Sequence, residues 1–181
     1  MLGIVFTSLI DMLEEKVSPE FADDVIMEAE LENDGAYTAV GYYPFEQMQR
    51  LLGVLVEKTG KSENELLYDF GFYLFGKLAK AHGDVLANTD DMLDMLDMLA
   101  HLDDDIHVQV KKLYPDADLP RFKVLSRTDN AMRLQYYSER ELYAMAEGLM
   151  DAAAEHYQCK LERETHQLDT PHTYEFSISL V

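Results

Sequence analysis

Hydrophobic residues recur at helical spacing through most of the first 115 positions of the chain. Apolar side chains that return every three or four residues form one face of a helix, and acidic side chains occupy much of the remaining surface. This spacing predicts helices over residues 1–17, 19–32, 44–58, 66–81, about 90–100 and about 103–114. The helix over 66–81 is apolar around most of its circumference, so we expect it to lie at the centre of the fold.

Capping and turn residues mark where several of these helices begin and end. Ser62, followed three residues later by Glu65, has the capping-box pattern and precedes the central helix. Pro115 ends the last helix of this region, because proline cannot continue a helix. We expect a loop at residues 82–89, from which Thr89 caps the helix that follows.

From residue 119 onward the hydrophobic pattern repeats every two residues, which is typical of strands. This alternation predicts strands over residues 122–125, 132–136, 160–167 and 173–180. One helix, over about 139–157, separates the two pairs of strands. The order of helices, hairpin, helix and hairpin indicates an α+β fold with a small antiparallel sheet.

Composition and charge narrow the classes of function. The chain has 181 residues, with 15 basic and 35 acidic side chains and a net charge of −20. We therefore expect no nucleic acid and no membrane surface as a partner, because both are anionic and would be repelled. Hydrophobic residues make up 48% of the chain, which is too many for an acidic disordered tail. The length predicts a single domain over residues 1–181.

Cysteine usage and the N-terminal pattern suggest a cellular location. Cys159 stands alone, so the chain cannot form an intramolecular disulfide or a cysteine-based zinc site. No basic residue precedes the N-terminal apolar run, and no run reaches the roughly 20 apolar residues that a membrane helix needs. We therefore expect a soluble, cytoplasmic protein.

The aspartates between residues 90 and 97 alternate with methionines and leucines at helical spacing, so we interpret them as a solvated face rather than a calcium loop.

Tyr136, Ser138 and Arg140 form the most informative local pattern. Side chains two residues apart on a strand point to the same side, so an apolar face ends here in a phenol, a hydroxyl and a guanidinium. Three such donors suit an anion such as a carboxylate or a phosphate. The same spacing also fits a tyrosine packed on the next helix, a capping serine and a surface arginine, and spacing does not choose between the two interpretations.

His107 lies in the helix predicted over 103–114 and shares one face with Val110 and Tyr114. A neutral imidazole among apolar neighbours can ligate a metal, and it can equally be a hydrogen-bonded core residue. The other histidines do not have metal-site spacing and are interpreted as surface residues. The chain has no Gly-x-Ser-x-Gly elbow and no glycine-rich phosphate loop.

Several motifs, spread almost from end to end, together resemble one family. They are Met1-Leu2-Gly3-Ile4-Val5-Phe6, Asp69-Phe70-Gly71-Phe72-Tyr73-Leu74-Phe75, Ile106-His107, Lys112-Leu113-Tyr114-Pro115, Leu119-Pro120, Tyr136-x-Ser138-x-Arg140 and Ala146-Glu147-Gly148-Leu149. This set resembles the H-NOX family, the haem nitric-oxide/oxygen-binding domains that occur alone in bacteria and as the sensor region of animal soluble guanylate cyclases.

The resemblance implies haem b, Fe protoporphyrin IX, buried between two subdomains. They are a distal helical subdomain over about 1–62 and a proximal subdomain over about 63–181. His107 falls at the family's proximal ligand of the haem iron, and Pro120 matches a proline that helps to distort the porphyrin. The positions that hold the haem propionates in the family are occupied here by Tyr136, Ser138 and Arg140.

The resemblance also implies an apolar distal pocket for a gas. Oxygen-binding members present a tyrosine at the position of Met145, with polar residues at the positions of Leu9 and Leu74. The expected pocket is lined by Val5, Leu9, Leu74, Leu78, Met145 and Leu149. Bound oxygen carries partial negative charge and gains from a donor, so we expect binding of NO and CO without stable binding of oxygen. Tyr73 would change this expectation if its hydroxyl pointed into the pocket.

The function that follows from the resemblance is a non-enzymatic gas sensor. It would regulate a separate signalling protein, such as a histidine kinase or a cyclic-di-GMP cyclase or phosphodiesterase, and release of His107 by NO would let the subdomains shift. An oxygen-binding sensor and a haem-free acidic adaptor are the alternatives, and a peroxidase ranks last because it needs a distal acid–base pair. Some relatives carry a C-terminal zinc site, but its positions here hold Tyr143, Thr165, Thr173 and His172, so we predict no zinc.

Overall fold

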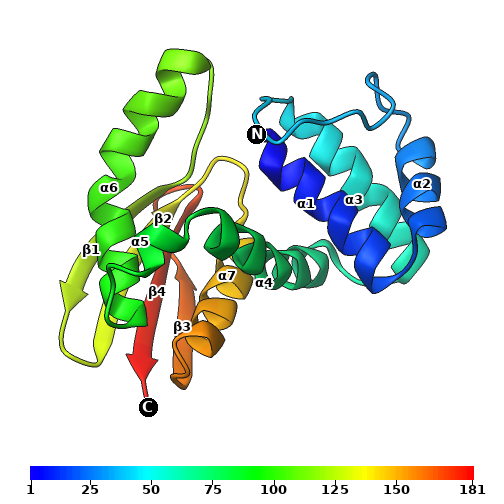
Figure 1. Cartoon of the computed structure of the whole chain (residues 1–181). Helices are drawn as coiled ribbons and strands as arrows, with labels where there is room; N and C mark the ends of the chain where they lie inside the picture. The colour runs from blue at the N-terminus through cyan, green and yellow to red at the C-terminus, as the bar shows by residue number, and fades with distance from the viewer.

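Helices fill the N-terminal half of the chain and an antiparallel sheet occupies much of the C-terminal half in this computed structural model (Figure 1). The structure describes residues 1–181, apart from the side chains of Val85, Asp103 and Ile106. The elements are α1 (Gly3–Lys16), α2 (Pro19–Glu28), α3 (Phe45–Thr59), α4 (Glu63–Ala81), α5 (Gly83–Leu86), α6 (Met92–Leu113), β1 (Arg121–Arg127), β2 (Ala131–Tyr137), α7 (Tyr143–His156), β3 (Leu161–Gln167) and β4 (Thr173–Leu180). The predicted α+β class is confirmed.

The first three helices pack together at one end of the molecule, and α4 leads from them to the sheet (Figure 1). Local hydrogen bonds set the starts of two helices. The Ser18 side chain accepts from the backbone N–H of Phe21 before α2, and the predicted capping box of Ser62 and Glu65 is present before α4. Helix α3 ends at Gly60, which has a φ of 71° and so adopts a left-handed conformation that suits glycine.

Helix α4 is central, as its apolar circumference predicts. It contacts α1 and α3 on one side and packs most extensively against α7 on the other. Two glycines allow the close approach of α4 and α7: a Cβ on Gly71 would overlap the Met145 carbonyl, and one on Gly148 would overlap the Tyr68 carbonyl. The absence of two side chains therefore brings these backbones into direct contact.

Several element boundaries differ from prediction. Residues 92–113 form a single helix of 22 residues rather than two, since no glycine or proline interrupts them. The cap of this helix is Asp91, whose side chain accepts from the N–H of Asp94, and not Thr89, whose hydroxyl bonds the Leu86 carbonyl. The expected loop at 82–89 contains the short helix α5.

Helix α7 begins at Tyr143, four residues later than about 139. Residues 138–141 instead form a turn, in which the Glu141 N–H donates to the Ser138 carbonyl and Glu141 itself has a φ of 51°. A positive φ cannot continue a right-handed helix, so the helix starts only after this residue.

The sheet has the order β1-β2-β4-β3, and its neighbouring strands run antiparallel. One face of β2 and β4 is buried against α7 and the first turns of α6. The buried residues on this face are Met132, Leu134, Tyr136, Tyr174, Phe176 and Ile178. A second hydrophobic cluster joins α1, α2, α3, α4 and the first part of α7. Among the described residues, none of the helices combines the length and hydropathy required to cross a membrane.

Candidate functional site

His107 lies on α6 with only 5% of its surface exposed. Its Nε2 is 3.0 Å from the carbonyl oxygen of Pro120, in the segment between α6 and β1. A carbonyl can only accept a hydrogen bond, so Nε2 carries a proton in this arrangement. Metal-ligating histidines are commonly oriented by such a bond from one ring nitrogen to a backbone carbonyl. The structure thus brings together His107, the expected ligand of the iron, and Pro120, the residue expected to distort the porphyrin. The side chain of Ile106 lies outside the described residues.

Tyr136 and Ser138 are almost fully buried at the end of β2, with 2% and 3% of their surfaces exposed, as the two-residue alternation predicts. Ser138 Oγ accepts the backbone N–H of Arg140 at 3.3 Å, which stabilises the turn before α7. Burial raises the pKa of Tyr136 to about 12, while a hydrogen bond with Ser138 and the charge of Arg140 act in the opposite direction. The phenol therefore stays protonated and can donate a hydrogen bond at neutral pH.

Arg140 is held by groups that sequence reasoning did not identify. Its Nη2 donates to the Tyr42 hydroxyl at 3.1 Å, and its Nε lies 3.4 Å from Oδ2 of Asp118. The guanidinium carbon also lies 5.2 Å from the centre of the Phe45 ring. Asp118 reaches Arg140 from another segment of the chain, so the guanidinium is paired with an acid in this structure. The two-residue alternation along a strand concerns only the residues of that strand, so it could not have revealed Asp118 as a partner of Arg140.

The six residues expected around the gas belong to one hydrophobic cluster formed by α1, α4 and α7. Leu9 and Leu74 are buried, with 1% and 2% of their surfaces exposed. The others are partly buried against the same cluster: Val5, Leu78, Met145 and Leu149. None of these six side chains carries a hydrogen-bond donor. Ser8, which is 3% exposed and precedes Leu9 on α1, is a buried hydroxyl that the sequence analysis did not single out.

Tyr73 points toward the second half of α1. The ammonium of Lys77 lies 5.2 Å from the centre of the Tyr73 ring, and the same ammonium pairs with Asp11 at 3.0 Å and Glu15 at 3.1 Å. Burial raises the pKa of Tyr73, while Lys77 lowers it and Glu15 raises it. Positions 73 and 77 share one face of α4, so the Tyr73 ring lies against the cation of this ion cluster. Within the described part of the chain, the Tyr73 hydroxyl is buried and has no hydrogen-bond partner.

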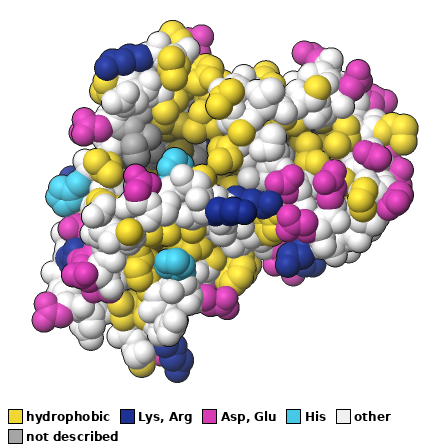
Figure 2. Space-filling model, viewed as in Figure 1, with side chains coloured by type: hydrophobic (Ala, Val, Ile, Leu, Met, Phe, Trp, Pro, Cys, Tyr) yellow, Lys and Arg dark blue, Asp and Glu magenta, His cyan; other side chains and the backbone are white. Residues whose placement is uncertain are grey.

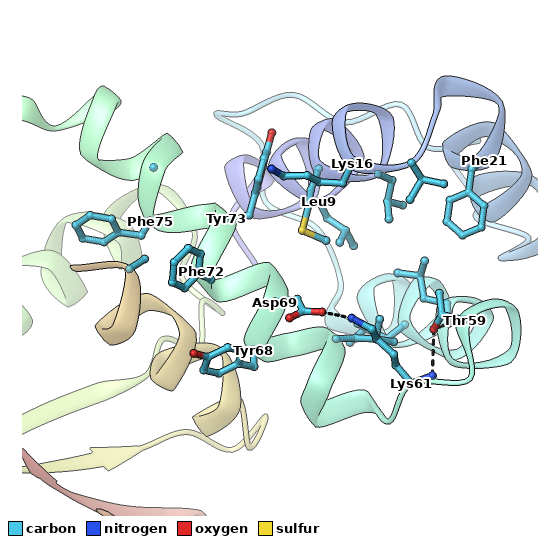
Figure 3. Close-up of a pocket in the computed structure, with 18 of the residues that line it drawn as sticks. Leu9, Lys16, Phe21, Thr59, Lys61, Tyr68, Asp69, Phe72, Tyr73 and Phe75 are labelled. Atoms are coloured by element: carbon cyan, nitrogen blue, oxygen red, sulfur yellow. Dashed lines mark hydrogen bonds and ion pairs between the residues drawn. The ribbon is translucent and has the colours of Figure 1, made fainter. Parts of the chain in front are cut away.

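A cavity of about 1080 Å³ lies between the N-terminal helices and α4, with Ala152 and His156 of α7 at its margin. Figure 3 shows Tyr68, Asp69, Phe72 and Tyr73 projecting from α4 around it. Of the six residues expected around the gas, this cavity includes only Leu9. It is therefore distinct from the predicted gas site, and no motif pointed to it.

The side chains of this site fit a haem rather than a metal ion held by protein ligands alone. Within the described part of the chain, no group of three or more His, Cys, Asp or Glu side chains could hold a metal ion. A single buried histidine fits a haem, because the porphyrin supplies four nitrogen ligands and needs one from the protein. Buried propionates need donors and a cation, which Tyr136, Ser138 and Arg140 provide. Figure 2 shows the surface hollowed between α6 and the N-terminal helices, with hydrophobic side chains around the hollow.

Comparison with known proteins identifies the family. A family model described as haem-NO-binding matches residues 2–165. The chain belongs to the H-NOX family. No curated protein sequence matches this H-NOX chain.

Solved structures agree with this assignment. The unliganded Fe(II) H-NOX protein of K. algicida is 34% identical, with 100% of this chain and 97% of that chain covered and a TM-score of 0.85. An S. oneidensis H-NOX protein in the Fe(II)NO ligation state is 26% identical, with coverage of 100% and 99% and a TM-score of 0.86. An oxygen-binding H-NOX domain, described as an oxygen complex, is 20% identical over 99% of this chain and 95% of that chain, with a TM-score of 0.80. At this identity the likeness supports the fold and nothing more.

The positions of the relatives' C-terminal zinc site are engaged in other contacts. The Tyr143 hydroxyl accepts a hydrogen bond from Asn64 at 2.8 Å, and the Thr165 hydroxyl donates to Glu147. Thr173 bonds the carbonyl of Pro171 at 3.0 Å. His172 lies 3.2 Å from Glu141.

Proposed function

We propose that this H-NOX protein is a haem-based sensor that binds NO and CO and does not bind oxygen stably. Haem b, when bound, would supply a ferrous iron that binds a diatomic gas. His107 would be the protein ligand of this iron, and the Pro120 carbonyl orients its ring at 3.0 Å. The proposed propionate donors are Tyr136, Ser138 and Arg140. Residues 1–62 and 63–181 are the proposed distal and proximal halves.

The observation that carries the gas preference is that none of the six side chains expected around the gas, on α1, α4 and α7, carries a hydrogen-bond donor. Leu9, Leu74 and Met145 occupy the positions at which polar side chains support oxygen in other members, and all three belong to this cluster. Tyr73 is not one of these residues, and its ring lies beside the ammonium of Lys77. Bound oxygen would therefore lack the hydrogen bond that offsets its partial charge, whereas NO and CO need none.

The proposed output is regulation of a separate signalling protein, a histidine kinase or a cyclic-di-GMP enzyme. Helix α4 belongs to the N-terminal cluster through Leu74 and also packs along α7. Movement of the N-terminal helices against the sheet would therefore be transmitted through α4. We propose that release of His107 shifts the balance between two such arrangements, in the manner of a ligand-biased two-state element. No catalytic activity is proposed for this chain.

The test is the absorption spectrum of the reduced, purified protein under argon, then in air, then with NO. We expect a five-coordinate high-spin ferrous spectrum that does not change at once in air and converts to a five-coordinate nitrosyl spectrum with NO. A stable oxygenated spectrum would contradict the proposed gas preference and would make Ser8 the first donor to substitute. Absence of a Soret band after haem reconstitution would contradict haem sensing and favour the haem-free adaptor.

A further inference from the structure

Tyr42 lies in the segment between α2 and α3 and reaches the C-terminal half of the chain through its hydroxyl. The hydroxyl oxygen accepts one hydrogen bond from Arg140 Nη2 at 3.1 Å and a second from the backbone N–H of Asp118 at 3.1 Å. Its ring stacks on Tyr114, with centroids 5.1 Å apart and an interplanar angle of 24°. A single side chain therefore joins three segments that are remote in sequence.

The chemistry of these bonds bears on how Arg140 can hold an anion. A tyrosine hydroxyl has two acceptor positions and one proton, and the two acceptor positions are used by Arg140 and Asp118. An arginine side chain loses considerable rotamer freedom when it binds, so holding it in advance strengthens binding. Tyr42 and Asp118 contact different nitrogens of Arg140, at Nη2 and at Nε. Together they restrain the guanidinium in one orientation, with 14% of the side chain exposed.

We propose that Tyr42 is a positioning residue for the haem carboxylate site, acting through Arg140. This inference rests on the proposed haem binding. The hydroxyl of Tyr42 fixes the guanidinium from the N-terminal half, so that a propionate meets an arginine that is already oriented. The same contact makes haem retention depend on the position of the segment that carries Tyr42.

The experiment compares the loss of haem to excess apomyoglobin from the wild type and four variants, all reconstituted in the ferric form. Tyr42→Phe removes the hydroxyl and keeps the ring on Tyr114. Tyr43→Phe is the matched control, because the Tyr43 hydroxyl bonds the backbone N–H of Thr38 at 2.8 Å and is directed elsewhere in the same segment. Arg140→Gln and the double variant Tyr42→Phe with Arg140→Gln complete the set.

Tyr42→Phe removes the hydrogen bonds from Arg140 and from the backbone of Asp118, and the bond to Arg140 is the one expected to affect haem retention. We expect this variant to lose haem about fivefold faster than the wild type and Tyr43→Phe to stay within about twofold of it. In the Arg140→Gln background, Tyr42→Phe should raise the rate of haem loss by less than about twofold, because the guanidinium that Tyr42 orients is gone. An unchanged rate in Tyr42→Phe would overturn the proposal. So would a fivefold effect that persists in the Arg140→Gln background, since Tyr42 would then act independently of Arg140.

A second measurement separates this inference from the proposed function. If the wild type takes up no haem, the proposed function fails, and the contact is tested in the haem-free proteins by urea unfolding of the same double-mutant cycle. Non-additive effects of Tyr42→Phe and Arg140→Gln on the unfolding midpoint would support the contact, and additive effects would contradict it.

Discussion

Glu175 is a carboxylate buried in a sheet, and one arginine neutralises it. Arg133 on β2 donates to it from Nε at 2.7 Å and from Nη2 at 2.8 Å, in the forked geometry that suits a carboxylate. The side chain of Glu175 is 11% exposed and that of Arg133 is 56% exposed, so the pair lies at the border of the solvent. The hydrogen bonds from Arg133 hold the pKa of Glu175 below its ordinary value of 4.5.

This pair predicts a pH dependence of stability. A carboxylate whose pKa is lowered in the folded state stabilises the protein above the unfolded pKa, and the contribution disappears as the pH falls through the lowered value. Between pH 7 and pH 3 the free energy of unfolding, measured with urea, should therefore fall more for the wild type than for Glu175→Gln. At pH 7 the Glu175→Gln variant should be less stable than the wild type by about 1 kcal/mol. Glu162→Gln, at an exposed position on β3, is the control. Equal acid sensitivity of the wild type and Glu175→Gln would refute the assignment.

His107 and His101 lie on the same helix in opposite environments. His107 is 5% exposed and bonded to Pro120, whereas the His101 side chain is 75% exposed and lies beside Asp97. We predict that His107→Gly loses the five-coordinate ferrous spectrum and that added imidazole restores it, because the small ligand replaces the missing side chain. His101→Gly should keep the wild-type spectrum. A His107→Gly protein with a normal spectrum in the absence of imidazole would exclude His107 as the ligand.

At the scale of elements, the contact between α4 and α7 depends on glycine. A Cβ at position 148 would overlap the Tyr68 carbonyl, while nothing lies within 4 Å of a Cβ at Gly76, on the exposed side of α4. Gly148→Ala should therefore destabilise the protein by about 1–3 kcal/mol, because the helices must separate. Gly76→Ala should stabilise it by about 0.5–1 kcal/mol, since alanine favours a helix interior.

Thermal or urea unfolding of both alanine variants checks this prediction. The two substitutions add the same methyl group to a helix, so the difference in sign isolates the contact between helices from helix propensity. Stabilisation by Gly148→Ala would mean that α4 and α7 can separate at no cost.

The whole molecule carries a net charge of −20, which shapes its stability. Several cations are already shared between two acids: Lys77 pairs with Asp11 and Glu15, and Arg127 pairs with Asp94 and Asp97. The remaining acids repel one another over the surface, which opposes the compact state.

We therefore predict that salt stabilises this protein. Raising NaCl from about 0.1 M to about 1 M shortens the Debye length from about 10 Å to about 3 Å and screens the repulsion. The melting temperature should rise by a few degrees, corresponding to about 1–2 kcal/mol. Scanning calorimetry at several salt concentrations measures this change in melting temperature. A falling melting temperature would show that the ion pairs outweigh the repulsion.

The sequence by itself determined most elements of the fold and supplied the site residues that are proposed here. Helical spacing and strand alternation depend on which face of an element is buried, and that information is local. The alternation through Met132, Leu134 and Tyr136 therefore predicted the buried face correctly. Local spacing did not decide whether His107 was a core residue or a ligand, and the H-NOX resemblance supplied that interpretation.

Only the tertiary structure decided which groups meet across the molecule. Tyr42 and Arg140 are 98 positions apart, and no periodic pattern connects residues at such a separation. The direction of Tyr73 was also decided by packing, because α1 brings Glu15 next to Lys77. Periodicity reports the environment of one element at a time, whereas these contacts depend on how several elements pack, so they emerge only once the chain has folded.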